Sequence, residues 1–502
     1  MHRSPLLFPR QPHALVLAGA LLLAALPARA ALFTPTQTAD DDGACDASCS
    51  LREAVLAANA NPGADVILLG PGVFEVSIAG AGEDAGATGD LDVTGDLTLA
   101  GESAASTVID GTGSGDRLID VHGARLELTG VTLRDGGGAG NGGLLHNLGG
   151  ELIVSRSVLT AGQALGAGSF GGAIYSDGAL SVAESTLHGS TTGGSGGAVA
   201  VKEALALVNS TLSDNQAGAF GGGLYVFADV AGDVSNTTIA ANAAGQSAGG
   251  VFVESAAFLG GSPKFHNTIV AGNTAPADPD CSGSADSLGF NLVGVGGGCF
   301  DFTAAHQDLV GTAAAPLNPQ IAALGDNGGP TPTHLPAAAS PAVNAGNPAA
   351  PGSGGAACQP IDQRGADRPG TGSTRCDIGS VERTGQCVPG GANLCLEQGR
   401  FQVTARWTIA SGQTGVAQAV QLTDDAGYFW FFSPENIEVT VKVLNACVPA
   451  FNRYWVFLAG MTNLKVDVTV TDTKTGQVKT YANPQGRVYR TILDTQAFNT
   501  CP

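Results

Sequence analysis

Gly142-Gly143-Leu144-Leu145 is the first of five similar phrases in a chain of 502 residues. Each phrase places two glycines before a pair of largely apolar residues, and the later copies begin at Gly171, Gly196, Gly222 and Gly249. The second glycines of the five pairs are separated by 29, 25, 26 and 27 residues. A repeat period of this length is typical of a stack of similar units in which each unit contacts only its neighbours.

A second phrase follows each glycine pair after about 15 residues and sets an apolar residue beside small polar ones. Asn209-Ser-Thr-Leu212 and Asn236-Thr-Thr-Ile239 are two copies, and short apolar runs such as Glu151-Leu-Ile-Val154 lie between the phrases. No stretch of the repeats has helical periodicity. These features predict an all-β fold in which residues 62–310 form a right-handed parallel β-helix, with the second glycines stacked in one column.

Asparagines recur at two matching places in the repeat. One set is Asn215, Asn242 and Asn273, and the other is Asn209, Asn236 and Asn267. Stacked coils bring equivalent residues into register, so amide side chains can form ladders along the axis. The alternative is a polar binding face. We favour corner and ladder residues, because every such solenoid needs them.

Composition excludes several classes of protein. Glycine and proline make up 99 of 502 residues (74 and 25), below the share typical of disorder, and there is no triplet period of collagen. The chain is 43% hydrophobic, which suffices for a long thin core, and its formal charge is −21. Because so acidic a surface repels nucleic acids and anionic lipids, we expect no nucleic-acid partner.

Residues 1–30 have the pattern of a secretory signal peptide. Arg3 and Arg10 precede an apolar run from His13 to Leu26, and Pro27-Ala-Arg-Ala30 follows as a small-residue cleavage site. We therefore expect cleavage between Ala30 and Ala31. No other long apolar run occurs, so we expect no transmembrane segment after cleavage and a secreted, extracellular or cell-outer-surface location.

All ten cysteines follow the predicted cleavage site. In an exported protein an even number of cysteines indicates disulfides, and a solenoid brings mainly local loops together. The expected pairs are Cys45–Cys49, Cys281–Cys299, Cys358–Cys376, Cys387–Cys395 and Cys447–Cys501. A zinc site is disfavoured, because no Cys-x-x-Cys occurs and no histidine follows at zinc spacing.

The mature chain divides into four parts. Residues 31–61 form an N-terminal segment in which Ser50 and Glu53 make a capping box for a short amphipathic helix, suited to cover the open end of a β-helix. The β-helix and a closing segment, residues 311–384, follow. Residues 385–502 carry all three tryptophans, and polar and apolar residues alternate in two of their segments, Glu438–Val443 and Lys465–Val470. This pattern predicts a separate antiparallel β-sandwich-like domain with Trp407 or Trp455 in its core. We expect both faces of Tyr428-Phe-Trp-Phe-Phe432 to be buried.

Several motifs resemble known bacterial families. Cys49-Ser-Leu-Arg-Glu-Ala54 is similar to the opening motif of CSLREA-domain proteins, and the glycine and asparagine phrases resemble polymorphic-outer-membrane-protein-type repeats. Gly325-Asp-Asn-Gly-Gly-Pro-Thr-Pro-Thr-His-Leu335 and Cys376-Asp-Ile-Gly379-Ser-Val-Glu382 resemble the choice-of-anchor Q domain. The resemblance covers residues 45–382 and implies a secreted or surface-held bacterial protein. It implies no particular activity.

The sequence identifies no catalytic residue. The acidic stretches are Asp40-Asp-Asp42 and Gly89-Asp-Leu-Asp-Val-Thr-Gly-Asp96, which we interpret as solvated strand faces, and His188 and His266 each stand alone. We therefore expect no cofactor, with Ca²⁺ at the second acidic stretch as the minor alternative.

Two classes of function remain. The favoured one is an exported bacterial surface or secreted protein with a structural, adhesive or binding role, whose partner is a surface glycan or a protein. The alternative is a carbohydrate-active enzyme, either a polysaccharide lyase or a glycoside hydrolase. Three carboxylates within ~8 Å on one long face of the solenoid would favour the enzyme, whereas the fold by itself does not decide.

Overall fold

The computed structural model describes residues 29–255, 261–299, 301–337, 339–370, 373–383, 387, 389–473 and 477–501. The predicted signal peptide lies almost wholly outside these residues, so its cleavage site stays a prediction. Within them, no helix has the length and apolar character needed to cross a membrane.

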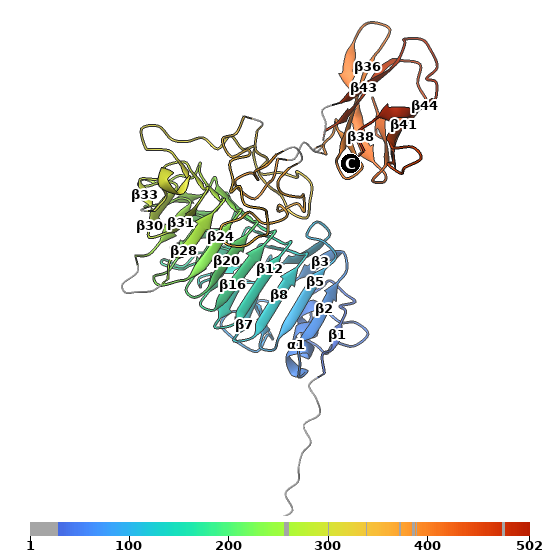
Figure 1. Cartoon of the computed structure of the whole chain (residues 1–502). Helices are drawn as coiled ribbons and strands as arrows, with labels where there is room; N and C mark the ends of the chain where they lie inside the picture. Colours follow the sequence, from blue (N-terminus) through green and yellow to red (C-terminus); the bar gives the residue numbers. More distant parts are fainter. Residues whose placement is uncertain are drawn as a thin grey trace, which may run out of the picture.

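A parallel β-solenoid forms the first part of the molecule, as predicted (Figure 1). Sheet A contains β1 (Leu32–Phe33), β2 (Asp65–Leu69), β5 (Leu97–Gly101), β8 (Arg125–Thr129), β12 (Glu151–Ser155), β16 (Ala179–Ala183), β20 (Leu205–Val208), β24 (Gly232–Ser235), β28 (Pro263–His266) and β31 (Asp286–Gly289). Sheet B contains β3 (Gly72–Glu75), β6 (Thr107–Asp110), β9 (Thr132–Arg134), β13 (Val158–Thr160), β17 (Thr186–His188), β21 (Thr211–Ser213), β25 (Thr238–Ala240), β29 (Ile269–Val270), β32 (Leu292–Val293) and β34 (Leu309–Val310).

Two further parallel sheets complete the coils. Sheet C contains β4 (Leu91–Val93), β7 (Ile119–His122), β11 (Leu145–Leu148), β15 (Ile174–Ser176), β19 (Val199–Val201), β23 (Leu224–Val226), β27 (Val251–Val253), β30 (Cys281–Gly283) and β33 (Gly298–Cys299). Sheet D contains β10 (Gly137–Gly138), β14 (Gln163–Ala164), β18 (Thr191–Thr192), β22 (Gln216–Ala217) and β26 (Ala243–Ala244). A short 3₁₀ helix, η1 (Ala304–His306), lies near the far end of the solenoid.

Stacked aliphatic side chains fill the solenoid. Leu133, Leu159, Leu187 and Leu212 are paired neighbours along sheet B, and all are fully buried. Successive residues of a strand point to opposite sides, so the residues directly before and after each leucine in its strand face outward. The core is therefore a set of apolar columns that run along the axis.

The predicted glycine column is right for three coils and wrong by one residue for the last two. Strand pairing aligns Gly143, Gly172, Gly197, Gly222 and Gly249, not Gly223 and Gly250. The residue before each of them has a positive φ, at Gly142, Gly171, Gly196, Gly221 and Ala248. The run Gly221–Gly223 concealed the register, and an alanine takes the left-handed position in the fifth coil. The aligned glycines lack a side chain because a Cβ there would meet the backbone of the next coil.

One asparagine column forms the predicted ladder. Asn215 Nδ2 donates to Asn242 Oδ1 at 2.9 Å, and Asn242 Nδ2 donates to Asn273 Oδ1 at 3.0 Å. Asn273 Nδ2 donates in turn to Asp280 Oδ1 at 3.0 Å. These side chains are buried, so this column is structural.

The second asparagine column forms no ladder, contrary to expectation. Asn209, Asn236 and Asn267 lie at corners with φ of 45°, 46° and 50°. Their side chains instead bind the backbone of the closing segment, for example Asn209 Nδ2 to the carbonyl oxygen of Ile361 at 2.8 Å. The backbone N–H of Gln359 likewise donates to Asn236 Oδ1 at 2.9 Å.

The closing segment lies along sheet B (Figure 1). Gln363 Nε2 donates to Thr186 Oγ1 at 2.9 Å, Thr211 Oγ1 donates to Gln363 Oε1 at 2.7 Å, and the N–H of Ser380 donates to Thr238 Oγ1 at 3.0 Å. The three threonines are paired neighbours on β17, β21 and β25, on the side away from the core. The outer face of sheet B is thus occupied by the protein's own chain.

Helix α1 (Leu51–Ala60) caps the first coil, as predicted. Ser50 and Glu53 form the reciprocal capping box. Leu51, Ala54 and Val55 are buried in the same core as the first strands, so the helix covers apolar surface that the end of a solenoid would otherwise expose.

The tail domain consists of two antiparallel sheets, as predicted. One has the order β35-β36-β42-β43, with β37 beside β36, and the other has the order β38-β39-β40-β41-β44. Their bounds are β35 Leu394–Leu396, β36 Phe401–Thr408, β37 Thr414–Val416, β38 Gln418–Gln421, β39 Ala426–Trp430, β40 Val439–Ala446, β41 Arg453–Gly460, β42 Lys465–Asp472, β43 Val478–Asn483 and β44 Ile492–Phe498.

The aromatic run at β39 buries one of its faces. Phe429 and Phe431 are in the core with Trp407, as expected for Trp407, whereas Trp455 is half-buried. Tyr428 and Trp430 are half-buried, and Phe432 is 58% exposed. The expectation that both faces are buried is therefore wrong, because strand alternation directs Tyr428, Trp430 and Phe432 away from the core.

The disulfides join the five predicted pairs. They are Cys45–Cys49, Cys281–Cys299, Cys358–Cys376, Cys387–Cys395 and Cys447–Cys501. Four bonds join cysteines 4 to 18 residues apart, Cys447–Cys501 spans 54 residues within the tail domain, and none joins the solenoid to the tail domain.

Candidate functional site

A column of polar and aromatic side chains runs along the outer side of sheet C, which we call the sheet C strip. In register it contains Asp92, Asp120, His146, Tyr175, Ala200, Tyr225 and Phe252. On β4 and β7 the flanking residues Leu91, Val93, Ile119 and Val121 are buried in the core. Alternation along the strands therefore places Asp92 and Asp120 on the opposite side from the core.

Four carboxylates gather at the first end of the strip, and we call them the carboxylate cluster. Asp90, Asp92, Asp116 and Asp120 are 3%, 1%, 6% and 4% exposed. One carboxylate oxygen each from Asp90, Asp92 and Asp120 lies within 4.8 Å of the others. The cluster therefore brings three carboxylates from consecutive coils together on one long face, as the enzyme alternative requires.

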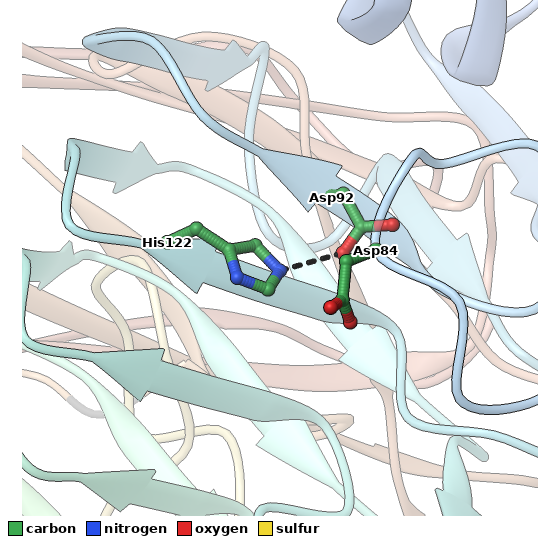
Figure 2. A group of neighbouring side chains, drawn as sticks. All are labelled: Asp84, Asp92 and His122. Carbon is green, nitrogen blue, oxygen red and sulfur yellow. Dashed lines mark hydrogen bonds and ion pairs between the residues drawn. The ribbon is translucent and has the colours of Figure 1, made fainter.

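A histidine borders the cluster. His122 Nε2 lies 2.8 Å from Asp92 Oδ1, and Asp84 approaches the same carboxylate from the loop before β4 (Figure 2). On the next coil, His146 Nδ1 lies 3.3 Å from Asp120 Oδ2. The site therefore places two imidazoles beside buried carboxylates.

The capping helix positions the loop before β4. Arg52 Nη1 donates to the carbonyl oxygens of Gly86 and Asp90, each at 2.9 Å, and Arg52 Nη2 donates to the carbonyl oxygen of Gly89 at 2.7 Å. Asp40 pairs with Arg52 at 2.9 Å, and both side chains are buried. An arginine is suited to this role because its fixed fork of donors meets several acceptors at once.

A second residue of the capping helix holds the strand itself. Asn59 Nδ2 donates to the carbonyl oxygen of Asp92 at 2.6 Å, and the N–H of Thr94 donates to Asn59 Oδ1 at 2.9 Å. The helix thus positions the site as well as covering the core.

Arg117 supplies positive charge to the cluster. Its Nη1 lies 2.5 Å from Asp120 Oδ2, and its Nε lies 3.7 Å from Asp116 Oδ1 and 3.8 Å from Asp90 Oδ2. Among the lysines and arginines in the described part of the chain, Arg117 is the one that pairs with these carboxylates. Four carboxylates thus share one guanidinium.

This imbalance changes proton affinities. Burial, followed by the negative charges of Asp116 and Asp92, raises the pKa of Asp90 to about 8. Burial also raises the pKa of Asp92 above its ordinary value. Burial opposes ionisation of Asp120 as well, but the hydrogen bond from His146 and the charges of His146 and Arg117 outweigh it and lower the pKa of Asp120.

The far half of the strip is aromatic. The rings of Tyr225 and Phe252 stack with centroids 5.3 Å apart and planes 7° apart, and Phe227 meets Tyr225 edge-on at 5.0 Å. Lys202 Nζ lies 5.9 Å and 5.4 Å from the ring centroids of Tyr175 and Phe227. Tyr175 and Tyr225 are buried, while Phe227 and Phe252 are half-buried.

The sequence located part of this site. The stretch Gly89–Asp96 does contribute to it, but the interpretation of solvated strand faces is wrong, because Asp90 and Asp92 are buried beside β7. The sequence interpretation missed Asp120 and His146. Their signal is the repeat itself, since Asp92, Asp120 and His146 are 28 and 26 residues apart, one coil each.

The other candidate residues lie elsewhere. Asp40 is the partner of Arg52. His188 lies on sheet B, and His266 lies on sheet A, where its Nε2 is 3.0 Å from Asp233 Oδ1. The structure therefore brings neither histidine to the carboxylate cluster.

Comparisons with known proteins identify no relative. No protein-family model, curated protein or solved structure matches the chain.

Proposed function

We propose that this is an exported bacterial surface or secreted protein of the CSLREA and choice-of-anchor Q type, with a structural or adhesive binding role. The signal-like residues 1–30 support export, and five disulfides suit an oxidising compartment outside the cytoplasm. The ligand that best fits is a glycan bound along the sheet C strip.

The strip itself is the observation that supports this proposal. Its residues repeat once per coil, so they are spaced by about 4.8 Å along the axis, similar to the length of one sugar residue in an extended polysaccharide. Of the strip residues, His146 and Phe252 are partly exposed, and Phe227 and Lys202 lie beside the strip at the surface, whereas Asp92, Asp120, Tyr175 and Tyr225 are buried. An imidazole hydrogen-bonds sugar hydroxyls, and aromatic rings stack on the apolar faces of sugars. The closing segment covers the outer face of sheet B, whereas the sheet C strip combines carboxylate, imidazole and aromatic side chains.

A carbohydrate-cleaving enzyme is the second candidate, favoured by the carboxylate cluster. Glycoside hydrolases separate their two carboxyl groups by about 5–5.5 Å or about 6.5–9.5 Å. One oxygen from each of Asp90, Asp92 and Asp120 lies within 4.8 Å of the others, so these carboxyl groups are close neighbours. A polysaccharide lyase, with Arg117 beside a group of carboxylates, suits the geometry better than a hydrolase does.

A glycan array with the mature protein tests the proposed role. Lys202→Ala, in the aromatic half of the strip, should weaken any binding found, because the exposed ammonium lies beside the Tyr175 and Phe227 rings. Lys264→Ala is the matched control, since this lysine is exposed on sheet A. Equal losses in the two variants, or no binding of any glycan, would contradict the proposal.

Incubation of the same polysaccharides with the protein tests the enzyme candidate. A lyase releases unsaturated sugar ends that absorb ultraviolet light, and a hydrolase releases reducing ends without that absorbance. Intact polymers after prolonged incubation would exclude both activities for the substrates used.

A further inference from the structure

We propose that the carboxylate cluster binds a divalent cation, Ca²⁺, through Asp90, Asp92 and Asp120. One oxygen of each carboxylate lies within 4.8 Å of the others, so a single ion can contact all three with small adjustments. The ligands come from two successive coils, because Asp90 and Asp92 lie at β4 and Asp120 lies on β7. This proposal does not depend on glycan binding.

Unsatisfied oxygen atoms point to a missing positive partner. Asp120 is 4% exposed, yet its Oδ1 accepts no hydrogen bond, and the nearby His146 Nδ1, at 3.3 Å, is outside hydrogen-bond geometry. Asp90 is 3% exposed, and its carboxylate accepts no hydrogen bond within the described part of the chain, but its oxygen atoms are not fully buried as Asp120 Oδ1 is. Because buried polar atoms are normally paired, Asp120 Oδ1 is the oxygen best suited to ligate an ion.

Charge leads to the same conclusion. Arg117 contacts Asp120 at 2.5 Å but stays 3.8 Å from Asp90. One guanidinium cannot neutralise four carboxylates that water scarcely reaches, and an unpaired buried charge is costly. Four ionised carboxylates and one guanidinium leave three negative charges, and a bound divalent cation would neutralise two of them.

The donor set favours calcium over a transition metal. Asp90, Asp92 and Asp120 offer oxygen ligands only, which hard cations prefer, and calcium tolerates irregular geometry. The neighbouring group Asp84, Asp92 and His122 includes an imidazole, which suits zinc (Figure 2). Both groups share Asp92, whose Oδ1 lies 2.8 Å from His122 Nε2 and whose Oδ2 accepts from the backbone N–H of Gly86 at 2.6 Å. The groups differ in burial, because Asp84 is exposed whereas Asp90 and Asp120 are buried.

Isothermal titration of the chelator-treated mature protein with CaCl₂ tests the proposal. We expect one ion per chain, with a Kd of about 10⁻⁴ to 10⁻³ M, as in extracellular calcium modules. Asp90→Asn should weaken binding by at least roughly tenfold, since even ligand-supporting residues cost 10–100-fold when changed. This variant should fold, because the Asp90 carboxylate accepts no hydrogen bond that the change would break.

Asp120→Asn should weaken binding as well, and Asp229→Asn is the matched control, because Asp229 is exposed in a turn with φ of 63°. No calcium binding by the wild-type chain up to millimolar concentration would overturn the proposal, as would undiminished binding by Asp90→Asn. A titration with ZnCl₂ separates the two groups. Tight zinc binding that is lost in His122→Gln, with no calcium binding, would place the metal at the histidine and refute the all-oxygen site.

Discussion

Replacing Asn242 by alanine removes the central rung of the asparagine ladder. The Asn242 side chain is fully buried, and its Nδ2 donates to the carbonyl oxygen of Leu212 and to Asn273 Oδ1, both at 3.0 Å. Its Oδ1 accepts from the backbone N–H of Asn215 at 3.0 Å and from Asn215 Nδ2 at 2.9 Å. Alanine would leave polar groups of two neighbouring coils unpaired in the interior.

The expected loss of stability follows from these hydrogen bonds. Each buried group left without a partner costs about 1–3 kcal/mol, and two or three groups are affected, so we expect a loss of about 3–5 kcal/mol in the local stability of these coils. Gln246→Ala is the matched control, because Gln246 is an exposed amide of the same coil whose side chain makes no hydrogen bond in the described structure. Surface changes of that kind are usually within about 0.5 kcal/mol.

Hydrogen exchange read by mass spectrometry is the suitable assay, because coils of a solenoid open locally and the tail domain unfolds as a separate unit. Peptides from β22 and β26 should lose protection in Asn242→Ala, while peptides from the tail domain should not change. If Asn242→Ala and Gln246→Ala give the same exchange rates, the ladder does not stabilise the solenoid and the reasoning is wrong.

Three further predictions concern the glycine column, the tail domain and the closing segment. Gly197→Ala should destabilise the solenoid by about 1–3 kcal/mol, because the new Cβ would meet the backbone of the next coil, whereas Gly70→Ala, with open space around it, should not; urea unfolding compares the two. Phe431→Ala should destabilise the tail domain by about 3–5 kcal/mol, and Trp430→Ala by clearly less, since Phe431 is in the core and Trp430 is half-buried; similar melting temperatures would contradict this assignment. Burial lowers the pKa of His334 in the folded chain below its ordinary value of about 6.5. Below that pH the unfolded chain binds a proton that the folded chain does not, so the free energy of unfolding falls as the solution is acidified. Limited proteolysis of residues 321–337 should therefore speed up between pH 7 and pH 5, and a rate that does not depend on pH would count against this.

The sequence predicted the solenoid because each coil repeats the same local choices. Gly142 and Gly171 mark positions where the chain needs a positive φ, and the apolar residues after each glycine pair recur at the spacing of one coil. The predicted alignment of the coils was wrong by one residue at Gly221–Gly223, because three successive glycines fit two alignments and only strand pairing distinguishes them.

The site was harder to predict because its residues belong to different repeats. Asp92 and Asp120 are unremarkable singly, and their proximity appears only when β4 and β7 are aligned. Arg52 was expected to belong to a cap, and its second role in holding the loop of Asp90 depends on a contact 38 residues away. The contact between Arg52 and the carbonyl oxygen of Asp90 occurs once in the chain and leaves no periodic signal, unlike the column of Asp92, Asp120 and His146.

The most direct test of the central claim, that the carboxylate end of the sheet C strip is a working site, is an anomalous difference map. Crystals of the mature protein grown with terbium, which replaces calcium at oxygen sites, would be measured at the metal edge. The account predicts one strong peak between the carboxylates of Asp90, Asp92 and Asp120. A map with no peak there, or with peaks only beside exposed carboxylates such as Asp229, would contradict it.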